Sequence, residues 1–155
     1  MTIMKKTLSL VISGLILFSM VAGTSCKKEE DPTKVVGTAS FPAGTAGDLS
    51  NAKVSLYLTM DDWYNNAPVL FTTAVGSGAS VTYEFKDLNP GNYYLDVWKD
   101  NDFDGYWSVG DYIGWYGSGG LGSPTLTPLQ VVDQETFTAN VSMYVLVPGL
   151  KMKKL

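Results

Sequence analysis

Alternation of apolar and polar side chains with a period of two residues is the feature that most constrains the fold of this chain. Four segments show it, at residues 53–59, 81–86, 93–98 and 136–145. In the first of them, Val54 and Leu56 alternate with Ser55 and Tyr57. Because successive side chains of a β-strand point to opposite faces, this pattern predicts strands that each bury one face.

Further strands are expected in segments that Gly, Pro, Asn and Asp turns separate. These segments are residues 35–41, 68–75, 112–115 and 129–132. No segment after the tether described below has convincing helical spacing. About seven short strands with one buried face each predict an all-β fold, a single antiparallel β-sandwich with immunoglobulin-like Greek-key connections.

The N-terminal segment, residues 1–25, has the layout of an export signal. Lys5 and Lys6 precede an apolar run over residues 8–22, and small residues follow. The run is shorter than the roughly 20 residues of a membrane-spanning helix. We therefore expect residues 1–25 to be a signal peptide that is absent from the mature protein.

The only cysteine of the chain, Cys26, follows this segment directly. The junction resembles the lipobox of bacterial lipoproteins, with small residues at Thr24 and Ser25, although Gly23 stands where an aliphatic residue is usual. Residues 27–31 are similar to the Lys-then-acid tether of surface-exported Gram-negative lipoproteins. The resemblance implies that Cys26 carries a lipid that anchors the protein to the outer membrane, at the cell surface or on its periplasmic face. The alternative is an ordinary secretory signal beside a free thiol.

Charge excludes one class of partner. All fifteen acids but only nine of the eleven lysines follow Ser25, so the mature chain has a formal charge of −6. No nucleic-acid partner is expected of such a chain. The expected organisation is a lipidated tether at residues 26–34, one sandwich domain at 35–147 and a basic tail at 148–155.

An acidic segment, residues 100–111, has the spacing of a calcium-binding loop. Its candidate ligands stand at loop positions 1, 3, 5, 7, 9 and 12, and are Asp100, Asp102, Asp104, Tyr106 through its carbonyl, Ser108 and Asp111. Gly105 occupies the position of the sharp turn, and Asp111 replaces the usual Glu. Calcium is therefore the expected cofactor. The alternative is a solvated acidic turn.

Short motifs along residues 35–147 are similar to those of transthyretin-like, carboxypeptidase-regulatory-type sandwiches. The clearest is the turn that opens a strand at Pro90, Gly91 and Tyr93. The resemblance implies the sandwich fold. It implies no ligand, because a shared fold does not carry a shared function.

Aromatic residues near the acidic segment are candidate ligand contacts. They are Trp98, Trp107, Trp115 and Tyr116. Flat rings stack on sugar faces or anchor a protein partner. The alternative is that loops cover these rings, or that they complete a second packed layer.

Catalytic constellations are weak. The chain has no His, and Asp61 and Asp62 are adjacent, so that on an extended chain they would point apart. Residues 117–122 match the dinucleotide fingerprint G-x-G-x-x-G in letters, but no helix is expected after them. We therefore expect a non-enzymatic binding or accessory module for an extracellular polysaccharide or an envelope protein assembly. The alternatives are a purely structural spacer and a small hydrolase that uses Asp61, Asp62 or another acid.

Overall fold

The computed structural model describes residues 31–149. The proposed signal peptide, Cys26 and most of the tether lie outside the described residues, as do residues 150–155 of the basic tail. Within residues 31–149, no helix is long and apolar enough to cross a membrane.

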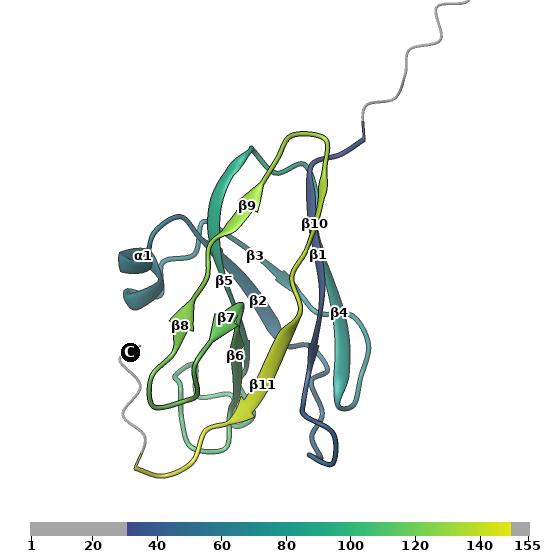
Figure 1. Cartoon of the computed structure of the whole chain (residues 1–155). Helices are drawn as coiled ribbons and strands as arrows, with labels where there is room; N and C mark the ends of the chain where they lie inside the picture. Colours follow the sequence, from purple (N-terminus) through teal and green to yellow (C-terminus); the bar gives the residue numbers. More distant parts are fainter. Residues whose placement is uncertain (1–30, 150–155) are drawn as a thin grey trace, which may run out of the picture.

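The described chain is all-β, which confirms the predicted fold class (Figure 1). Its elements are β1 (Lys34–Ser40), β2 (Lys53–Tyr57), α1 (Met60–Tyr64), β3 (Leu70–Thr73), β4 (Ser80–Phe85), β5 (Gly91–Lys99), β6 (Tyr112–Trp115), β7 (Gly117–Ser118), β8 (Thr125–Leu126), β9 (Leu129–Val131), β10 (Thr136–Thr138) and β11 (Val141–Val145). All the strands expected from alternation are present, and the last of them is interrupted at Ala139 and Asn140.

The main sheet is curled and mixed, where two separate antiparallel sheets were expected. Its strand order is β10-β1-β11-β6-β5-β2-β3, with β4 paired to β1 and β9 paired to β5. Strand β1 runs parallel to β10 and β11, and the other pairings are antiparallel. Beyond β3, Val75 and Thr82 exchange two backbone hydrogen bonds of 2.8 and 2.9 Å, which connect that edge of the sheet to the first half of β4.

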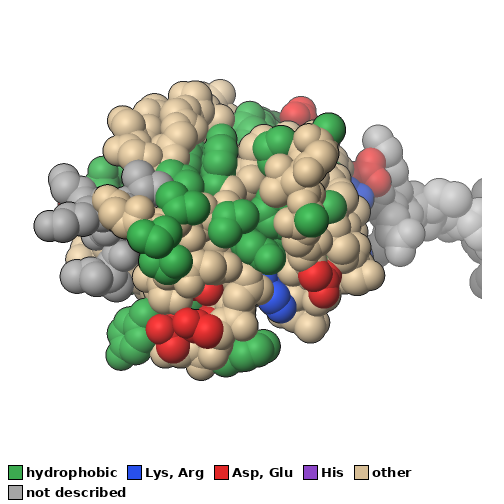
Figure 2. Space-filling model, turned by 90° about the horizontal axis from the view of Figure 1, so that it is seen from below, with side chains coloured by type: hydrophobic (Ala, Val, Ile, Leu, Met, Phe, Trp, Pro, Cys, Tyr) green, Lys and Arg blue, Asp and Glu red, His purple; other side chains and the backbone are tan. Residues whose placement is uncertain are grey.

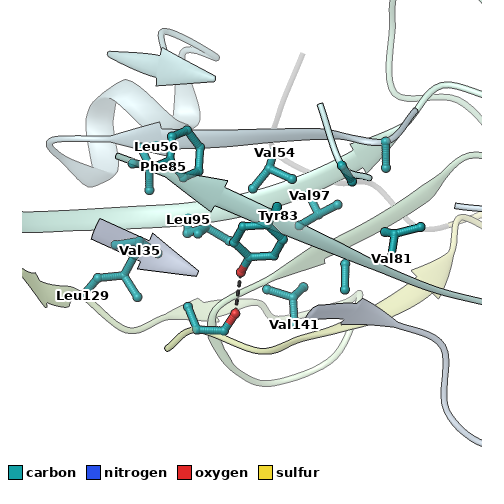
Figure 3. Close-up of a cluster of buried hydrophobic side chains, with 14 of the residues drawn as sticks. Val35, Val54, Leu56, Val81, Tyr83, Phe85, Leu95, Val97, Leu129 and Val141 are labelled. Atoms are coloured by element: carbon teal, nitrogen blue, oxygen red, sulfur yellow. Dashed lines mark hydrogen bonds between the residues drawn. The ribbon is translucent and has the colours of Figure 1, made fainter. Parts of the chain in front are cut away.

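The curl encloses a core built from the apolar residues of the alternating strands, as the sequence predicts (Figure 3). In β4, Val81, Tyr83 and Phe85 are buried between exposed neighbours. The Tyr83 hydroxyl donates a hydrogen bond across this core to the Ala139 carbonyl. Gly37 lies beside this contact, and a Cβ there would overlap the Ala139 carbonyl oxygen and the tyrosine ring. Glycine is therefore required where the two strands approach.

A second hydrophobic cluster covers the outer face of the sheet. Its buried members are Tyr57, Trp63, Ile113, Trp115, Leu126 and Leu146. They come from β2, α1, β6 and β8, and Leu146 directly follows β11. Tyr57, expected on the solvent face, is 1% exposed, so that expectation is wrong. The reason is that the outward face of β2 and β5 lies beneath a second packed layer, one of the alternatives that the sequence left open.

Helix α1 was not expected, because five residues are too few to show helical spacing. It begins after Thr59, whose hydroxyl accepts a 3.0 Å bond from the Asp62 amide. The Asp62 carboxylate accepts in return from the Thr59 amide and hydroxyl, at 3.0 and 2.7 Å. This capping box ends β2 at Tyr57 and carries Trp63 into the outer cluster.

Candidate metal centre

The acidic segment forms the connection between β5 and β6, at the lower end of the molecule as drawn in Figure 1. Its chain turns through left-handed backbone conformations at Phe103, Gly105 and Gly110, with φ of 61°, 80° and 103°. Two of these are glycines, for which such angles carry little cost. The turns fold the first half of the loop back on itself.

This fold brings three of the predicted ligands together. Carboxylate oxygens of Asp100, Asp102 and Asp104 lie within 4.8 Å of one another. Asp100 is half-buried and the other two are exposed, so solvent reaches the group. Three negative charges at this separation repel one another, and a cation among them would relieve the repulsion.

Backbone amides of the loop also compensate these charges. Asp100 accepts from the Phe103 amide through one oxygen and from the Gly105 amide through the other, at 2.7 and 2.9 Å. Asp104 accepts from the Tyr106 amide at 2.7 Å. An ionised carboxylate has about four acceptor positions, so these bonds leave lone pairs free for a metal ion.

Ser108, the candidate at loop position 9, is also beside the group. Its hydroxyl donates to Asp102 at 3.0 Å. Tyr106, the candidate at loop position 7, donates its amide hydrogen to Asp104. The residue is 71% exposed. The candidate metal-ligand atoms gathered here are therefore oxygens of carboxylates and a hydroxyl, the ligand type that calcium prefers. The residues present fit a hard cation.

Asp111, the sixth candidate, is not among the carboxylates whose oxygens lie within 4.8 Å of one another. It is 1% exposed, and protein donors engage both of its oxygens. One oxygen accepts from the Asn101 amide at 2.9 Å, and the other from the Trp98 indole and the Ser108 amide, at 3.0 and 3.1 Å. The structure thus uses Asp111 to fasten the two ends of the loop to β5.

The candidate aromatic contacts have different environments. Trp115 is 5% exposed, stacks on Tyr144 at 5.3 Å between ring centroids and donates its indole hydrogen to the Ser118 carbonyl. Its ring is therefore covered, as in the alternative in which loops or a second layer bury these aromatic residues, and it has no ring face to offer a ligand. Tyr116 packs edge-on against Phe137 beside the inner core, with 5.9 Å between centroids.

Trp98 and Trp107 are partly buried, and both pack against the outer cluster. The indole nitrogen of Trp98 is fixed by its bond to Asp111. This bond places the Trp98 ring directly beside the acidic loop, and its partial exposure leaves part of the ring accessible.

Sequence reasoning missed a buried carboxylate at Asp96, which it placed on the solvent face of β5. Asp96 is 2% exposed and accepts from the Trp63 indole at 2.9 Å and from the Tyr57 hydroxyl at 3.2 Å. Burial, together with the charge of Asp96, raises the pKa of the Tyr57 phenol, which therefore stays protonated and donates. The available signal for this buried carboxylate was the position of Asp96 in a stretch rich in tyrosine and tryptophan.

The remaining residues that the sequence singles out belong to the start of α1 and to the β7–β8 hairpin. Asp62 belongs to the cap of α1, and Asp61 lies exposed beside it in the first turn. Residues 117–122 begin the β7–β8 hairpin, in which the Ser123 amide donates to the Gly120 carbonyl at 2.9 Å. A hairpin there provides no helix N-terminus for a pyrophosphate.

Comparison with known proteins gives no relative for this chain. No protein family, curated protein or solved structure matches it.

Proposed function

We propose that this protein is a non-enzymatic, calcium-stabilised β-module of the outer membrane, a binding or accessory component for an extracellular glycan or protein assembly. The observation that carries the proposal is the convergence of the carboxylates of Asp100, Asp102 and Asp104 in one exposed loop. A calcium ion would supply the charge that this group lacks, and the role of the ion is structural.

The effect of the ion is local, because Asp111 already fastens both ends of the loop. Asp111 ties Asn101, Ser108 and Trp98 together without a metal. Calcium would therefore order the outer part of the loop, around Phe103 and Tyr106. Extracellular calcium modules have dissociation constants of about 0.1 to 1 mM, so about 1 mM calcium would stabilise the fold by roughly 0.5 to 1.5 kcal/mol.

The proposed location rests on the N-terminal sequence. A lipid on Cys26 would hold the protein at the outer membrane, with the surface as the proposed side. The described chain begins at one end of the molecule, while the acidic loop lies at the other (Figure 1). This arrangement supports a module that presents the loop away from the lipid.

A purely structural spacer is the second candidate. The observation that favours it is the use of aromatic residues in packing, since Tyr57, Trp63 and Trp115 are buried in the outer cluster. A spacer needs a stable fold and no ligand. Saturable binding of any extracellular polymer would count against it.

Thermal unfolding in EDTA and across a calcium series tests the ion. We expect calcium to raise the melting temperature by about 2 to 6 °C. The variant Asp102→Asn with Asp104→Asn should unfold in EDTA at or above the wild-type temperature, because two repelling charges are removed, and should lose the calcium response. Asp100 is left intact because two backbone amides depend on it.

The matched control removes two charges far from the loop, with Asp31→Asn and Asp61→Asn, both exposed residues. This control should keep the full calcium response. Equal melting temperatures of the wild type in EDTA and in calcium would show that the loop is an acidic turn and end the proposal.

A further inference from the structure

A pocket of about 270 Å³ opens beside the acidic loop. Lys53 and Trp98, which pair across β2 and β5, line it with side chains that face away from the inner core. Its lining residues are Asn51, Lys53, Trp98, Lys99, Asp100 and Phe103. Sites for whole small molecules have volumes of about 300 to 1,000 Å³, so we expect this pocket to hold one unit of a longer ligand.

The charged side chains at the pocket offset one another. The Lys53 and Lys99 ammonium groups line it together with the Asp100 carboxylate. Further carboxylates stand close to both kinds of group, since Asp100 belongs to the three-carboxylate group of the loop and the charge of Lys99 acts on Asp48. Figure 2, which looks at this end of the molecule, shows acidic, basic and hydrophobic side chains near one another. A strongly charged ligand of either sign would therefore meet repulsion as well as attraction, and a neutral ligand is favoured.

The same side chains supply both donors and acceptors of hydrogen bonds. Two backbone amides engage the Asp100 carboxylate, which leaves further acceptor positions on its oxygens. Lys99 donates to the Ser50 carbonyl at 2.6 Å and has three donors in all. The Asn51 side chain offers two donors and an acceptor. A hydroxyl group both donates and accepts, so a ligand with several hydroxyls can use this mixed lining.

Two aromatic rings form the apolar part of the pocket. The Trp98 indole donates to Asp111 at 3.0 Å, so its ring is oriented before any ligand arrives. Phe103 is 83% exposed, and the fold therefore gains little burial from its ring. An oriented ring beside an exposed one provides a flat surface on which the C–H face of a sugar can stack.

The backbone around the pocket offers no edge to an extended peptide. Strand β2 lies between β3 and β5, and β5 lies between β2 and β6. Lys53 is paired with Thr73 on one side and with Trp98 on the other, and Trp98 is paired in turn with Ile113. A peptide that adds as a strand needs an edge with free backbone groups. Recognition at this pocket therefore depends on side chains, which favours a saccharide over a peptide.

From these observations we infer that the pocket binds one unit of a neutral saccharide. The C–H face of the sugar lies against Trp98 and Phe103, and its hydroxyls donate to Asp100 and accept from Lys53 and Asn51. This inference rests on the proposed binding function and names the ligand class and the side chains that recognise it.

Isothermal titration calorimetry of the chain after Cys26 tests the inference with six defined probes. Four are neutral saccharides that differ in sugar or linkage, namely cellotetraose, maltotetraose, mannotetraose and chitotetraose. A galacturonate tetrasaccharide adds negative charge to a sugar chain, and tetraalanine is a neutral peptide. We expect saturable binding of at least one neutral saccharide, weaker binding of the galacturonate and no binding of the peptide.

Two variants with matched controls locate the site. Phe103→Ala should lower the affinity about two- to tenfold, because it removes a stacking surface. Tyr106→Ala, which truncates another exposed ring of the loop outside the pocket lining, should leave the affinity unchanged. Lys53→Met should lower it about tenfold through the loss of a charged donor, while Lys86→Met, the same change at an exposed surface, should have no effect. Neither test variant removes a carboxylate of the loop, so both should keep the calcium response.

The inference is overturned if none of the four neutral saccharides binds, if the galacturonate or the peptide binds as well as the best of them, or if Phe103→Ala and Lys53→Met bind like the wild type. Its failure is distinguishable from failure of the calcium proposal, since the two have separate readouts. A calcium-dependent melting temperature without saccharide binding would remove the inference alone. Saccharide binding with no effect of calcium on the melting temperature would remove the calcium role and keep the pocket.

Discussion

Asp96 and Asp100 lie four residues apart, one within β5 and one directly after it, yet their carboxylates meet opposite environments. Asp96 is 2% exposed and accepts from the side chains of Tyr57 and Trp63. Asp100 accepts backbone amides of its own loop and faces two further carboxylates. Burial among side-chain donors makes Asp96 part of the fold, whereas solvent reaches the group around Asp100, which leaves carboxylate oxygens for a cation.

Among the substitutions of these carboxylates, Asp96→Ala should lower the free energy of unfolding most. It leaves the Tyr57 hydroxyl and the Trp63 indole without their carboxylate acceptor in a buried site. Since the loss of a buried hydrogen bond to a charged acceptor costs about 1 to 3 kcal/mol, we expect a loss of about 3 kcal/mol in the free energy of unfolding, measured by urea titration. Asp96→Asn, which keeps one acceptor oxygen, should lose less. A loss below about 1 kcal/mol for the alanine variant would show that Asp96 does not support the fold.

Asp111 belongs to the loop by sequence but is buried like Asp96. The variant Asp111→Asn therefore distinguishes a metal ligand from a carboxylate that supports the fold. Replacing one carboxylate oxygen by a donor removes an acceptor from either Asn101 or the pair Trp98 and Ser108. We expect a loss of about 1 to 3 kcal/mol in EDTA, by urea titration, and a retained rise of the melting temperature in calcium. If the calcium response disappears while the protein stays folded, Asp111 is a metal ligand and moves to the other group.

The smallest effect on stability is expected at Asp48, an exposed carboxylate whose hydrogen bonds hold two loops together. The Gly78 amide chiefly lowers the pKa of Asp48 below 3.8, with further bonds from Ser50. A lowered folded-state pKa means that the stabilisation is present above about pH 4 and is lost as the pH falls through the folded-state value. The urea midpoint of the wild type should therefore fall more between pH 5 and pH 2 than that of Asp48→Asn. Equal slopes would contradict the role of Asp48, and Asp31→Asn, exposed at the other end, should keep the wild-type slope.

The strands of the inner core could be predicted from the sequence, because one face of each is buried by the same sheet. Val81, Tyr83 and Phe85 of β4 show this directly. The outer face could not be predicted in the same way. Tyr57 and Asp96 look like surface residues in an alternating pattern, and only the placement of α1 and the β7–β8 hairpin over them makes them buried.

The acidic loop shows the same limit within twelve residues. Spacing alone brings Asp100, Asp102 and Asp104 together, because their positions depend on local turns. The place of Asp111 depends on the pairing of β5 with β6, which sets the Trp98 indole beside it. A pocket of about 270 Å³ beside the loop is still less visible in the sequence, since two of its lining residues, Lys53 and Lys99, come from different strands.

Strand β1 begins at the upper end of the molecule and runs towards the end that carries the acidic loop (Figure 1). Hydrogen-bonded neighbours flank it on both sides, with β4 antiparallel along residues 35–40 and β10 and β11 parallel on the other edge. Tension between the two ends of the molecule would act along this strand. Such a pull loads the hydrogen bonds of β1 in shear, so that they resist together and do not open one after another. Although each bond contributes only about 1 kcal/mol, their parallel arrangement makes this sheet suited to bearing mechanical force.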